Sequence, residues 1–360
     1  MSLSDCVILT AQSLFSLYVN AGPTVVPLNL RERYANTFYG SGDLEPECMK
    51  VYEDCCTSLG QLLSFESEKA KGGSIVIMSG EGMVGLWAGL KSVIPWPFYH
   101  SEEDGSLKME TGRKYKVLCV GNGAYGCWMK DMVKSLRYPN VEIQAIDSAW
   151  DQPIDVEKSV KTIQEWQPDL VTMVHCDTPT GALNSEAVCA VGEACSKTDA
   201  LFYVDVVSSA GAAPVDIAGW GIDIAFSCEP SLAIITVSAK AWKQVEKVAY
   251  TGYDALLPFK DFQKSGLFPY TPLWSALDAL NVHLKEVFGP KGDMRQQVYD
   301  RHEKVAQYCR ERVRQMGLKL WWADDRYSSP SVTAIRVPDN TTWEELDKKL
   351  RKESVVLGGR

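Results

Sequence analysis

The sequence lacks the features that mark membrane, secreted and nucleic-acid-binding proteins. It contains no run of about 18 apolar residues, so we expect no membrane-spanning helix. The first residues are mildly apolar, but they have no basic n-region of the kind that a secretory signal needs. A net charge of -9 argues against nucleic-acid binding, which requires a basic surface. With 46% apolar and 23% charged residues, the composition is that of an ordinary soluble globular protein.

Metal ligands and disulfide patterns are also scarce. Only four histidines are present, and no second cluster of ligands accompanies any of them, so we expect no metal site. The 11 cysteines are odd in number and include no pair of CxxC motifs, which favours free thiols in a reducing compartment. We therefore expect a cytoplasmic protein, with the peroxisome and the mitochondrion as alternatives.

The middle of the chain alternates short apolar runs with longer helical segments. This alternation predicts an α/β fold with a mostly parallel sheet that is covered on both faces. The length of 360 residues suffices for one large and one small domain. Strands are predicted at 74–78, 116–120, 141–146, 170–175, 201–205, 222–226 and 232–238, and helices at 82–94, 124–136, 156–166 and 185–196.

The character of the sequence changes after residue 250, where prolines and glycines punctuate a loop-rich stretch. Thr342 and Glu345 have the spacing of a capping box, which predicts the start of a helix. This tail reads as a small α+β domain. Its predicted elements are helices at 273–288, 295–316 and 342–352 and a strand at 331–337.

Ligands of such sheets bind beyond the carboxyl ends of the strands, so the loops that follow the strands are the candidate sites. The turn at 79–83 (SGEGM) can hold a phosphate at a helix N-terminus, or it can be a structural turn. The loop at 121–126 (GNGAYG) superficially resembles a dinucleotide fingerprint, but the acidic residue that completes the fingerprint is missing. Tyr125 in this loop can stack on a flat ring, or it can shield the loop from solvent.

Two further loops carry polar groups. In the loop at 175–181 (HCDTPTG), His175 and Cys176 are strand neighbours, so they point to opposite faces and do not form a catalytic dyad. Asp205 ends an apolar strand, and a buried carboxylate needs a partner. A protonated pyridine nitrogen is one such partner, and the alternative is that Asp205 caps the following turn.

In this order, the loops resemble those of the class V aminotransferases, such as the alanine–glyoxylate, serine–pyruvate and 2-aminoethylphosphonate transaminases. The resemblance begins at 22–27 (GPTVVP) and extends to 358–359. It implies a fold-type I pyridoxal-phosphate (PLP) transferase with a seven-stranded-type sheet, a large PLP-binding domain at 22–270 and a small C-terminal domain at 271–360. It also implies a homodimer that transfers an amino group from a small amino acid to a 2-oxo acid such as glyoxylate or pyruvate.

The resemblance also assigns residues of this chain to the cofactor. Its phosphate would be bound by backbone amides at the glycine turn and by the FPYT segment (268–271) of the neighbouring subunit. The assigned residues are Glu81, Gly82 and Met83 at the phosphate, Tyr125 and Val207 on the ring faces, Thr178 near the phenolic oxygen, Asp205 at the ring nitrogen, and Thr271 at the partner's phosphate.

The sequence departs from the family at the lysine that forms a Schiff base with PLP and then moves the substrate proton. Relatives carry Gly-Ser-Gln-Lys there, whereas this chain reads AFSCEPSL at 225–232. Counted without a gap, Ser231 stands at the lysine position, and no catalytic residue can be named. Lys240 and Lys243 follow on the next helix and are interpreted as surface charges.

A second departure lies at the C-terminus. The sequence ends at Arg360, before the strand with the Arg-Ile-Gly motif whose arginine binds the substrate carboxylate in relatives, and Arg360 is not given that role. We expect an incomplete C-terminal domain, weakened PLP binding and impaired transamination. The alternatives are an inactive pseudoenzyme that pairs with an intact paralogue or binds a metabolite, another PLP reaction of the same fold, and a binding module without cofactor.

Overall fold

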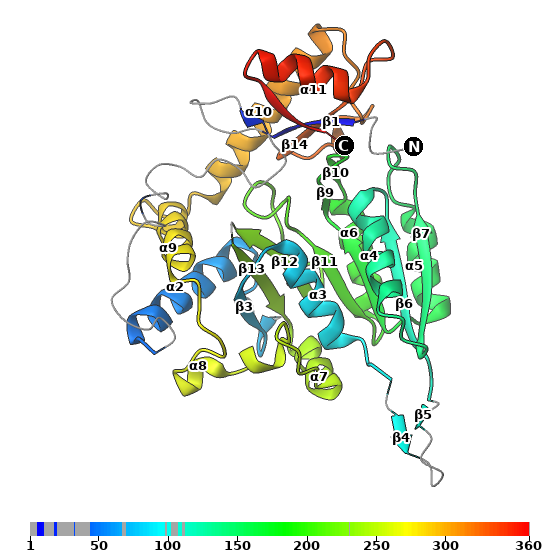
Figure 1. Cartoon of the computed structure of the whole chain (residues 1–360), viewed down its shortest axis with the longest axis vertical. Coiled ribbons are helices and arrows are strands. Elements are labelled where there is room, and N and C mark those ends of the chain that lie inside the picture. Colours follow the sequence, from blue (N-terminus) through cyan, green and yellow to red (C-terminus); the bar gives the residue numbers. More distant parts are fainter. Residues whose placement is uncertain are drawn as a thin grey trace.

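A seven-stranded sheet forms the centre of the molecule (Figure 1). The computed structural model describes residues 6–10, 18–19, 32, 44–66, 70–97, 99–101, 107–109, 112–229 and 231–359. The strand order is β3-β13-β12-β11-β8-β6-β7, which confirms the α/β fold that the sequence predicts. The strands are β3 (Ser74–Ser79), β6 (Tyr115–Gly121), β7 (Val141–Asp147), β8 (Leu170–Val174), β11 (Leu201–Asp205), β12 (Ile224–Glu229) and β13 (Leu232–Val237).

The strand directions bring the candidate loops to one edge of this sheet. β12, β11, β8, β6 and β7 pair in parallel, whereas β13 runs antiparallel to both β12 and β3. β3 therefore runs in the same direction as the five parallel strands. Since the carboxyl ends of these strands meet at one edge, the loops after Ser79, Gly121, Val174 and Asp205 lie on the same side of the molecule.

Helices cover the sheet, and glycines allow close contact between helix and strand. A methyl group added at Gly89 of α3 would lie 2.4 Å from Cζ of Phe226 on β12, so only glycine fits there. α2 packs against α9 beside the sheet (Figure 1). The helices of this domain are α2 (Pro46–Leu62), α3 (Gly82–Val93), α4 (Ala124–Ser135), α5 (Val156–Trp166), α6 (Ser185–Ser196), α7 (Ala239–Val248), α8 (Phe262–Ser265) and α9 (Trp274–Phe288), with the 3-10 turn η3 (Leu257–Phe259).

A second, smaller sheet with strand order β14-β1-β15-β2 lies above the first in Figure 1. The N-terminal strand β1 pairs antiparallel with β14, with Cys6 opposite Arg336, so both ends of the chain meet here. Thr342 accepts a hydrogen bond from the Glu345 amide at 3.3 Å, which confirms the predicted helix start. The elements are β1 (Cys6–Thr10), β2 (Tyr18–Val19), α10 (Arg295–Gln315), η4 (Asp325–Tyr327), β14 (Val332–Arg336), α11 (Trp343–Lys352) and β15 (Val356–Gly359).

The described residues form separate hydrophobic cores, and the domain boundary at residues 270 and 271 stays a prediction. α9 buries Leu277 and Leu280 in the core of the large sheet, whereas Trp321 and Trp322 belong to a separate core. The change from one core to the other therefore falls after α9, and the N-terminal strands join the small domain. None of the helices in the described part of the chain is both long and apolar enough to span a membrane.

Two short hairpins lie outside the two larger sheets. β4 (Tyr99–Ser101) pairs antiparallel with β5 (Leu107–Met109) and projects from the large domain in Figure 1. β9 (Cys176–Asp177) pairs with β10 (Ala182–Leu183) directly after β8. The second hairpin lies at the edge where the candidate loops meet, and it carries Asp177 and Thr178.

Candidate active site

Asp205 is the last residue of β11 and is almost completely buried, with 5% of its surface exposed. Its Oδ1 atom accepts a hydrogen bond from the Val207 amide at 2.8 Å. No other described residue gives its carboxyl a hydrogen bond or an ion pair. Burial raises the pKa of Asp205 to about 7, the Val207 bond opposes this shift, and the nearby Asp177 adds to it. A buried carboxyl in this state is suited to bind a cationic or hydrogen-bond-donating group.

The glycine turn before α3 contacts the loop that follows Asp205. A methyl group added at Gly82 would lie 3.2 Å from Cγ2 of Val207 and 3.7 Å from the Cys228 sulfur. There is therefore little space for a side chain where α3 begins close to β11 and β12. Through Val207, the structure brings the predicted phosphate turn next to the predicted ring-nitrogen ligand.

Asp177 connects the Tyr125 loop to the same place. Its Oδ2 atom accepts a hydrogen bond from the Tyr125 amide at 2.8 Å, and its Oδ1 atom accepts one from the Thr180 hydroxyl at 2.9 Å. A methyl group at Gly123 would lie 2.3 Å from the Asp177 carboxyl carbon, so the two loops pack without space for a side chain. The half-buried Tyr125 ring packs edge-on against Trp128, with centroids 4.9 Å apart.

Thr178 lies against the loop that follows Asp205. Its hydroxyl forms a hydrogen bond with the Ser208 hydroxyl. From the small domain, the Ser331 hydroxyl donates to the Ser208 carbonyl at 2.5 Å. Asp205, Val207, Tyr125 and Thr178 therefore belong to one connected group of loops, as the strand-end argument predicts.

His175 has a structural role in this group. Its Nδ1 atom contacts the Ser209 hydroxyl and its Nε2 atom contacts the Ser185 hydroxyl, both at 2.8 Å. Burial lowers its pKa to about 4, so the imidazole is neutral at pH 7. Since both ring nitrogens are bonded to serines, it does not activate Cys176, whose sulfur lies 3.9 Å from the Ser331 hydroxyl. The two neighbours therefore have separate partners.

Known proteins share this architecture and sequence. Residues 129–230 match the family described as class-V aminotransferase. An uncharacterized aminotransferase of Methanocaldococcus jannaschii is 32% identical over 263 residues, which cover 68% of this chain and 64% of the relative. The pyridoxamine–pyruvate transaminase of Mesorhizobium japonicum is 29% identical over 332 residues, which cover 88% of this chain and 75% of the relative.

The solved structures agree with the sequence comparisons. The crystal structure of pyridoxamine–pyruvate aminotransferase from Mesorhizobium loti superposes with a TM-score of 0.81 and 25% identity, and the match covers 97% of this chain and 84% of that one. Over the matched regions, the chain is similar in sequence and in fold to the class V aminotransferases. Its fold is the fold-type I architecture that the sequence predicts.

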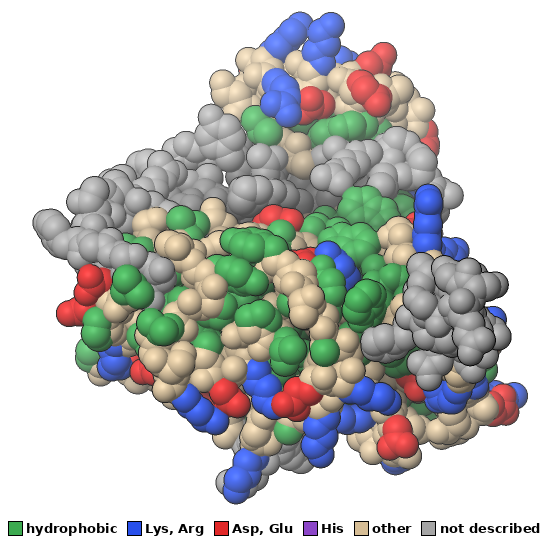
Figure 2. Space-filling view, turned by 60° about the horizontal axis from the view of Figure 1, so that its bottom comes forward, with side chains coloured by type: hydrophobic (Ala, Val, Ile, Leu, Met, Phe, Trp, Pro, Cys, Tyr) green, Lys and Arg blue, Asp and Glu red, His purple; other side chains and the backbone are tan. Residues whose placement is uncertain are grey.

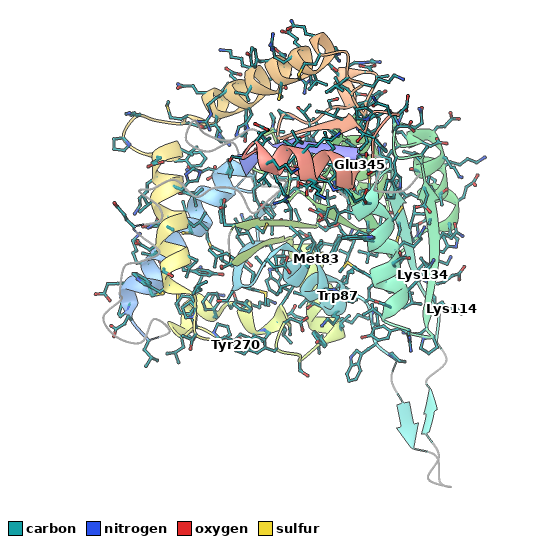
Figure 3. The ribbon with its side chains drawn as sticks, turned by 45° about the horizontal axis from the view of Figure 1, so that its top comes forward. Met83, Trp87, Lys114, Lys134, Tyr270 and Glu345 are labelled. Carbon is teal, nitrogen blue, oxygen red and sulfur yellow. The ribbon has the colours of Figure 1, made fainter. Side chains whose placement is uncertain are left out.

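The phosphate of PLP, the cofactor of class V aminotransferases, does not fit the hydrogen bonds of the glycine turn. The Gly80 amide donates to the Ser231 carbonyl at 2.9 Å, and the Gly82 amide faces the Cys228 sulfur, where it lowers the pKa of the thiol. The Met83 amide donates to the carboxylate of Glu81 at 2.8 Å. Met83 lies at the start of α3, one turn before Trp87 (Figure 3). The amides of Gly82 and Met83, which the sequence assigns to the phosphate, thus already have partners within the chain.

A tight turn stands at Ser231, the position that the resemblance assigns to the Schiff-base lysine. β12 and β13 pair up to Glu229 opposite Leu232, and Ser231 in the turn has a φ of 69°, in the left-handed region. Lys240 lies at the other end of the strands, where it donates to the Ala200 carbonyl and pairs with Asp223 at 3.5 Å. Lys243 is exposed on α7. Both lysines therefore lie at a distance from Ser231, as the sequence interpretation holds.

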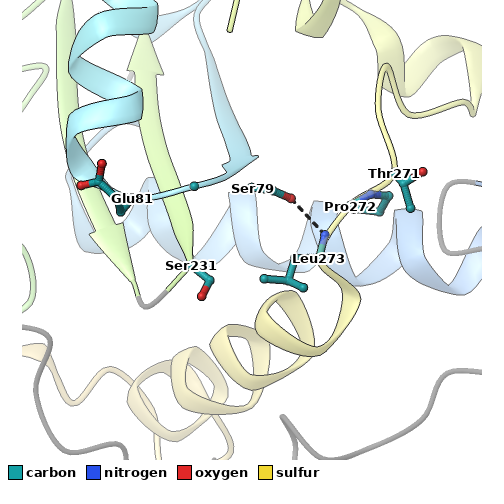
Figure 4. A pocket seen from close by; sticks show the side chains of 7 residues that line it. Ser79, Glu81, Ser231, Thr271, Pro272 and Leu273 are labelled. Carbon is teal, nitrogen blue, oxygen red and sulfur yellow. Dashed lines mark hydrogen bonds between the residues drawn. The ribbon is translucent and has the colours of Figure 1, made fainter. Parts of the chain in front are cut away.

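A cavity of about 600 Å³ opens beside this turn (Figure 4). The Ser79 hydroxyl accepts a hydrogen bond from the Leu273 amide at 3.2 Å. This bond connects the two walls of the cavity. Thr271, which the sequence assigns to the partner's phosphate, lines the cavity together with Glu81 of its own chain. Its lining residues are Ser79, Gly80, Glu81, Ser231, Thr271, Pro272 and Leu273.

The sequence reasoning named neither Cys228 nor Glu229 as a site residue. Burial raises the pKa of Glu229 to about 7 and that of Cys228 to about 12. Cys228 alternates with Phe226 along β12, and both contact α3, so the period of the strand could have placed its thiol in the site. The GPTVVP segment at 22–27, where the resemblance begins, and Arg360, which has no assigned role, lie outside the described residues.

Proposed function

We propose that this chain is an aminotransferase that moves an amino group from a small amino acid to a 2-oxo acid such as glyoxylate or pyruvate. Similarity to the class V aminotransferases supports the reaction class. Relatives named as pyridoxamine–pyruvate, L-aspartate–glyoxylate and serine–glyoxylate aminotransferases share a small 2-oxo acid as acceptor, although the matched regions of the last two cover less than two thirds of their length.

The observation that carries the proposal is the buried carboxyl of Asp205, which has no cationic partner among the described residues. In the proposed site, Asp205 holds the nitrogen of a pyridine ring in its protonated form. A protonated pyridine ring is an electron sink for the carbanion that forms when an amino acid loses its α-proton. Tyr125 and Val207 would pack against the ring, and Thr178 would lie near its phenolic oxygen.

The turn at Ser231 supports the proposal that the ring is held without a covalent link. With no lysine in this turn, a general base is also missing, and such a base typically contributes about 10²–10⁴-fold to a rate. We therefore propose weakened cofactor binding and slow turnover, with the inherited specificity for small 2-oxo acids retained.

Amino transfer can be tested directly with the purified protein, a ring ligand in its amine form as the amino donor, and pyruvate or glyoxylate as the acceptor. We expect slow formation of alanine or glycine, measured by chromatography. Asp205→Ala should abolish it, whereas Asp155→Ala, at the cap of α5 away from the site, should not. Ring binding by the native protein without any amino transfer would contradict the reaction and identify a pseudoenzyme.

We also propose a homodimer with sites at the subunit interface. Large apolar side chains are exposed on the segment before α9, where Tyr253 is 74%, Leu267 55% and Leu273 38% exposed. Apolar side chains also gather over the middle of one face of the molecule (Figure 2). Sedimentation of the native protein and of a Leu267→Glu variant tests this: we expect a dimer that the variant weakens, and a monomeric native protein would contradict it.

The proposed compartment is the cytoplasm. Ten of the cysteines, among them Cys48, Cys119 and Cys228, are free thiols. Free thiols are maintained in reducing compartments, so their number supports this location. Imaging of the tagged native protein tests it, and targeting to another organelle would contradict it.

A further inference from the structure

The first turn of α3 carries a carboxylate where class V aminotransferases hold a phosphate. We infer that the ring ligand of this site bears a neutral hydroxymethyl group in place of the 5′-phosphate, and that Glu81 sets this preference. This inference rests on the proposed function, because it names the ligand class of the same site. The probes that represent the two ligand classes are pyridoxamine and pyridoxamine 5′-phosphate.

The hydrogen bonds at the start of α3 are the first observation that supports this preference. A helix N-terminus binds phosphate through amides that have no other partner and through the positive end of its dipole. Here the Glu81 side chain caps the helix by accepting from the Met83 amide at 2.8 Å. The Gly80 amide donates to the Ser231 carbonyl, and the Gly82 amide faces the Cys228 sulfur. A phosphate would have to displace these partners, and the anion that compensates the dipole is already present.

The charge around the turn carries the second part. The thiol of Cys228 lies next to Gly82. Burial is the main cause that raises its pKa, and the carboxylates of Glu229, Asp205 and Glu81 raise it further. No described lysine or arginine forms an ion pair or a hydrogen bond with these three carboxylates. A phosphate monoester, with a charge of about -1.5 to -2 at pH 7, would be repelled there.

An independent observation supports a ring rather than a simple anion as the ligand. Asp205 is buried beside the same turn, and only Val207 donates to its carboxyl among the described residues. A protonated pyridine nitrogen suits this carboxyl, and a hydroxymethyl group can donate a hydrogen bond to the carboxylate of Glu81. Glu81 lies at the edge of the cavity that contains Ser231 (Figure 4).

Calorimetric titration of the full chain with each of the two probes tests the inference. We expect pyridoxamine to bind at least about tenfold more tightly than its 5′-phosphate, the ratio that one charge-assisted hydrogen bond supplies. Glu81→Ser removes the charge and keeps a residue that caps helices well, so the ratio should fall or invert. Asp155→Ser is the matched control: it replaces an acidic cap on α5, where Asp155 accepts from the Lys158 amide at 3.0 Å, and it should leave the ratio unchanged.

The outcomes separate this inference from the proposed function. Tighter binding of the phosphate by the native protein, or an unchanged ratio in Glu81→Ser, overturns the inference and leaves the ring site intact. Binding of neither probe overturns the ring site itself and the inference with it. Asp205→Asn should weaken both probes to a similar extent, because it acts on the ring that they share.

Discussion

The Asp177 carboxylate fixes the backbone of Tyr125, since its Oδ2 atom accepts the Tyr125 amide at 2.8 Å where α4 begins. Its Oδ1 atom accepts from the Thr180 hydroxyl at 2.9 Å, so the same side chain also closes the β9–β10 hairpin. Burial raises the pKa of Asp177, and the hydrogen bonds that it accepts oppose this shift. One buried carboxyl thus sets the position of two loops of the proposed ring site.

Asp177→Ala should therefore destabilise the protein more than the loss of a surface acid. It leaves buried donors at Tyr125 and Thr180 unpaired, and each such donor costs about 1–3 kcal/mol. Urea unfolding would measure the change in the free energy of unfolding. The control is Asp147→Ala, which breaks a surface ion pair with Lys130 and should cost less than about 1 kcal/mol. Equal losses in the two variants would contradict the role of Asp177.

Asp205→Asn should change the pH dependence of stability. Burial raises the pKa of Asp205 from 3.8 to about 7, so between these values the folded protein keeps a proton that the unfolded chain releases. The contribution of Asp205 to the free energy of unfolding therefore decreases as the pH rises toward 7. Asparagine carries no such proton, so the ligand-free variant should gain about 3 kcal/mol of stability relative to the native protein between pH 5 and pH 8.

The measurement is urea unfolding of both ligand-free proteins at several pH values. The difference in stability between the two proteins is informative because His175, whose pKa is about 4, is present in both proteins. Its effect on stability has the opposite pH dependence to that of Asp205, and it cancels in the difference. Its unfolded form takes up a proton below about pH 6.5, so it adds stability as pH rises. A constant difference from pH 5 to pH 8 would show that Asp205 is ionised in the folded protein.

The sheet and its helices could be predicted from the sequence because their signals are local. The helices at 156–166 and 185–196 have the predicted bounds, since polar and apolar residues alternate there with a clear helical period. The small domain was less accessible. β1 pairs with β14, which places Cys6 opposite Arg336, and no local pattern reveals a partner more than 300 residues away.

The candidate site shows the same limit. Asp205, Tyr125 and Thr178 could be found because strand ends gather at one edge of a parallel sheet. Three other features of the site depend on side-chain conformation or on the geometry of a turn, and no local sequence pattern predicts them. These are the cap that Glu81 forms on Met83, the contact of Cys228 with Gly82, and the turn at Ser231.

Gly192→Ala should destabilise the protein, although alanine favours helices by about 1 kcal/mol over glycine. Gly192 lies in α6, and a methyl group added there would lie 1.8 Å from the carbonyl oxygen of Trp220. A backbone atom cannot rotate away, so the helix must shift, at a cost of about 1–3 kcal/mol or more. Thermal unfolding would measure it, with the exposed Gly112→Ala as control, because nothing lies within 4 Å of a methyl group there. A stabilised Gly192→Ala variant would show that the helix adapts freely.

Trp322→Phe should weaken the attachment of the small domain to the site. The buried Trp322 indole donates to the Thr180 carbonyl at 2.9 Å, and Thr180 in turn binds Asp177. Phenylalanine removes the donor and leaves a void, so the free energy of unfolding should fall by about 1–3 kcal/mol. Trp96→Phe is the control, since Trp96 is 47% exposed and its replacement should cost less than about 1 kcal/mol. Because Asp177 also holds the Tyr125 backbone, the Trp322 variant should bind pyridoxamine more weakly, whereas unchanged binding together with reduced stability would limit the contact to a structural role.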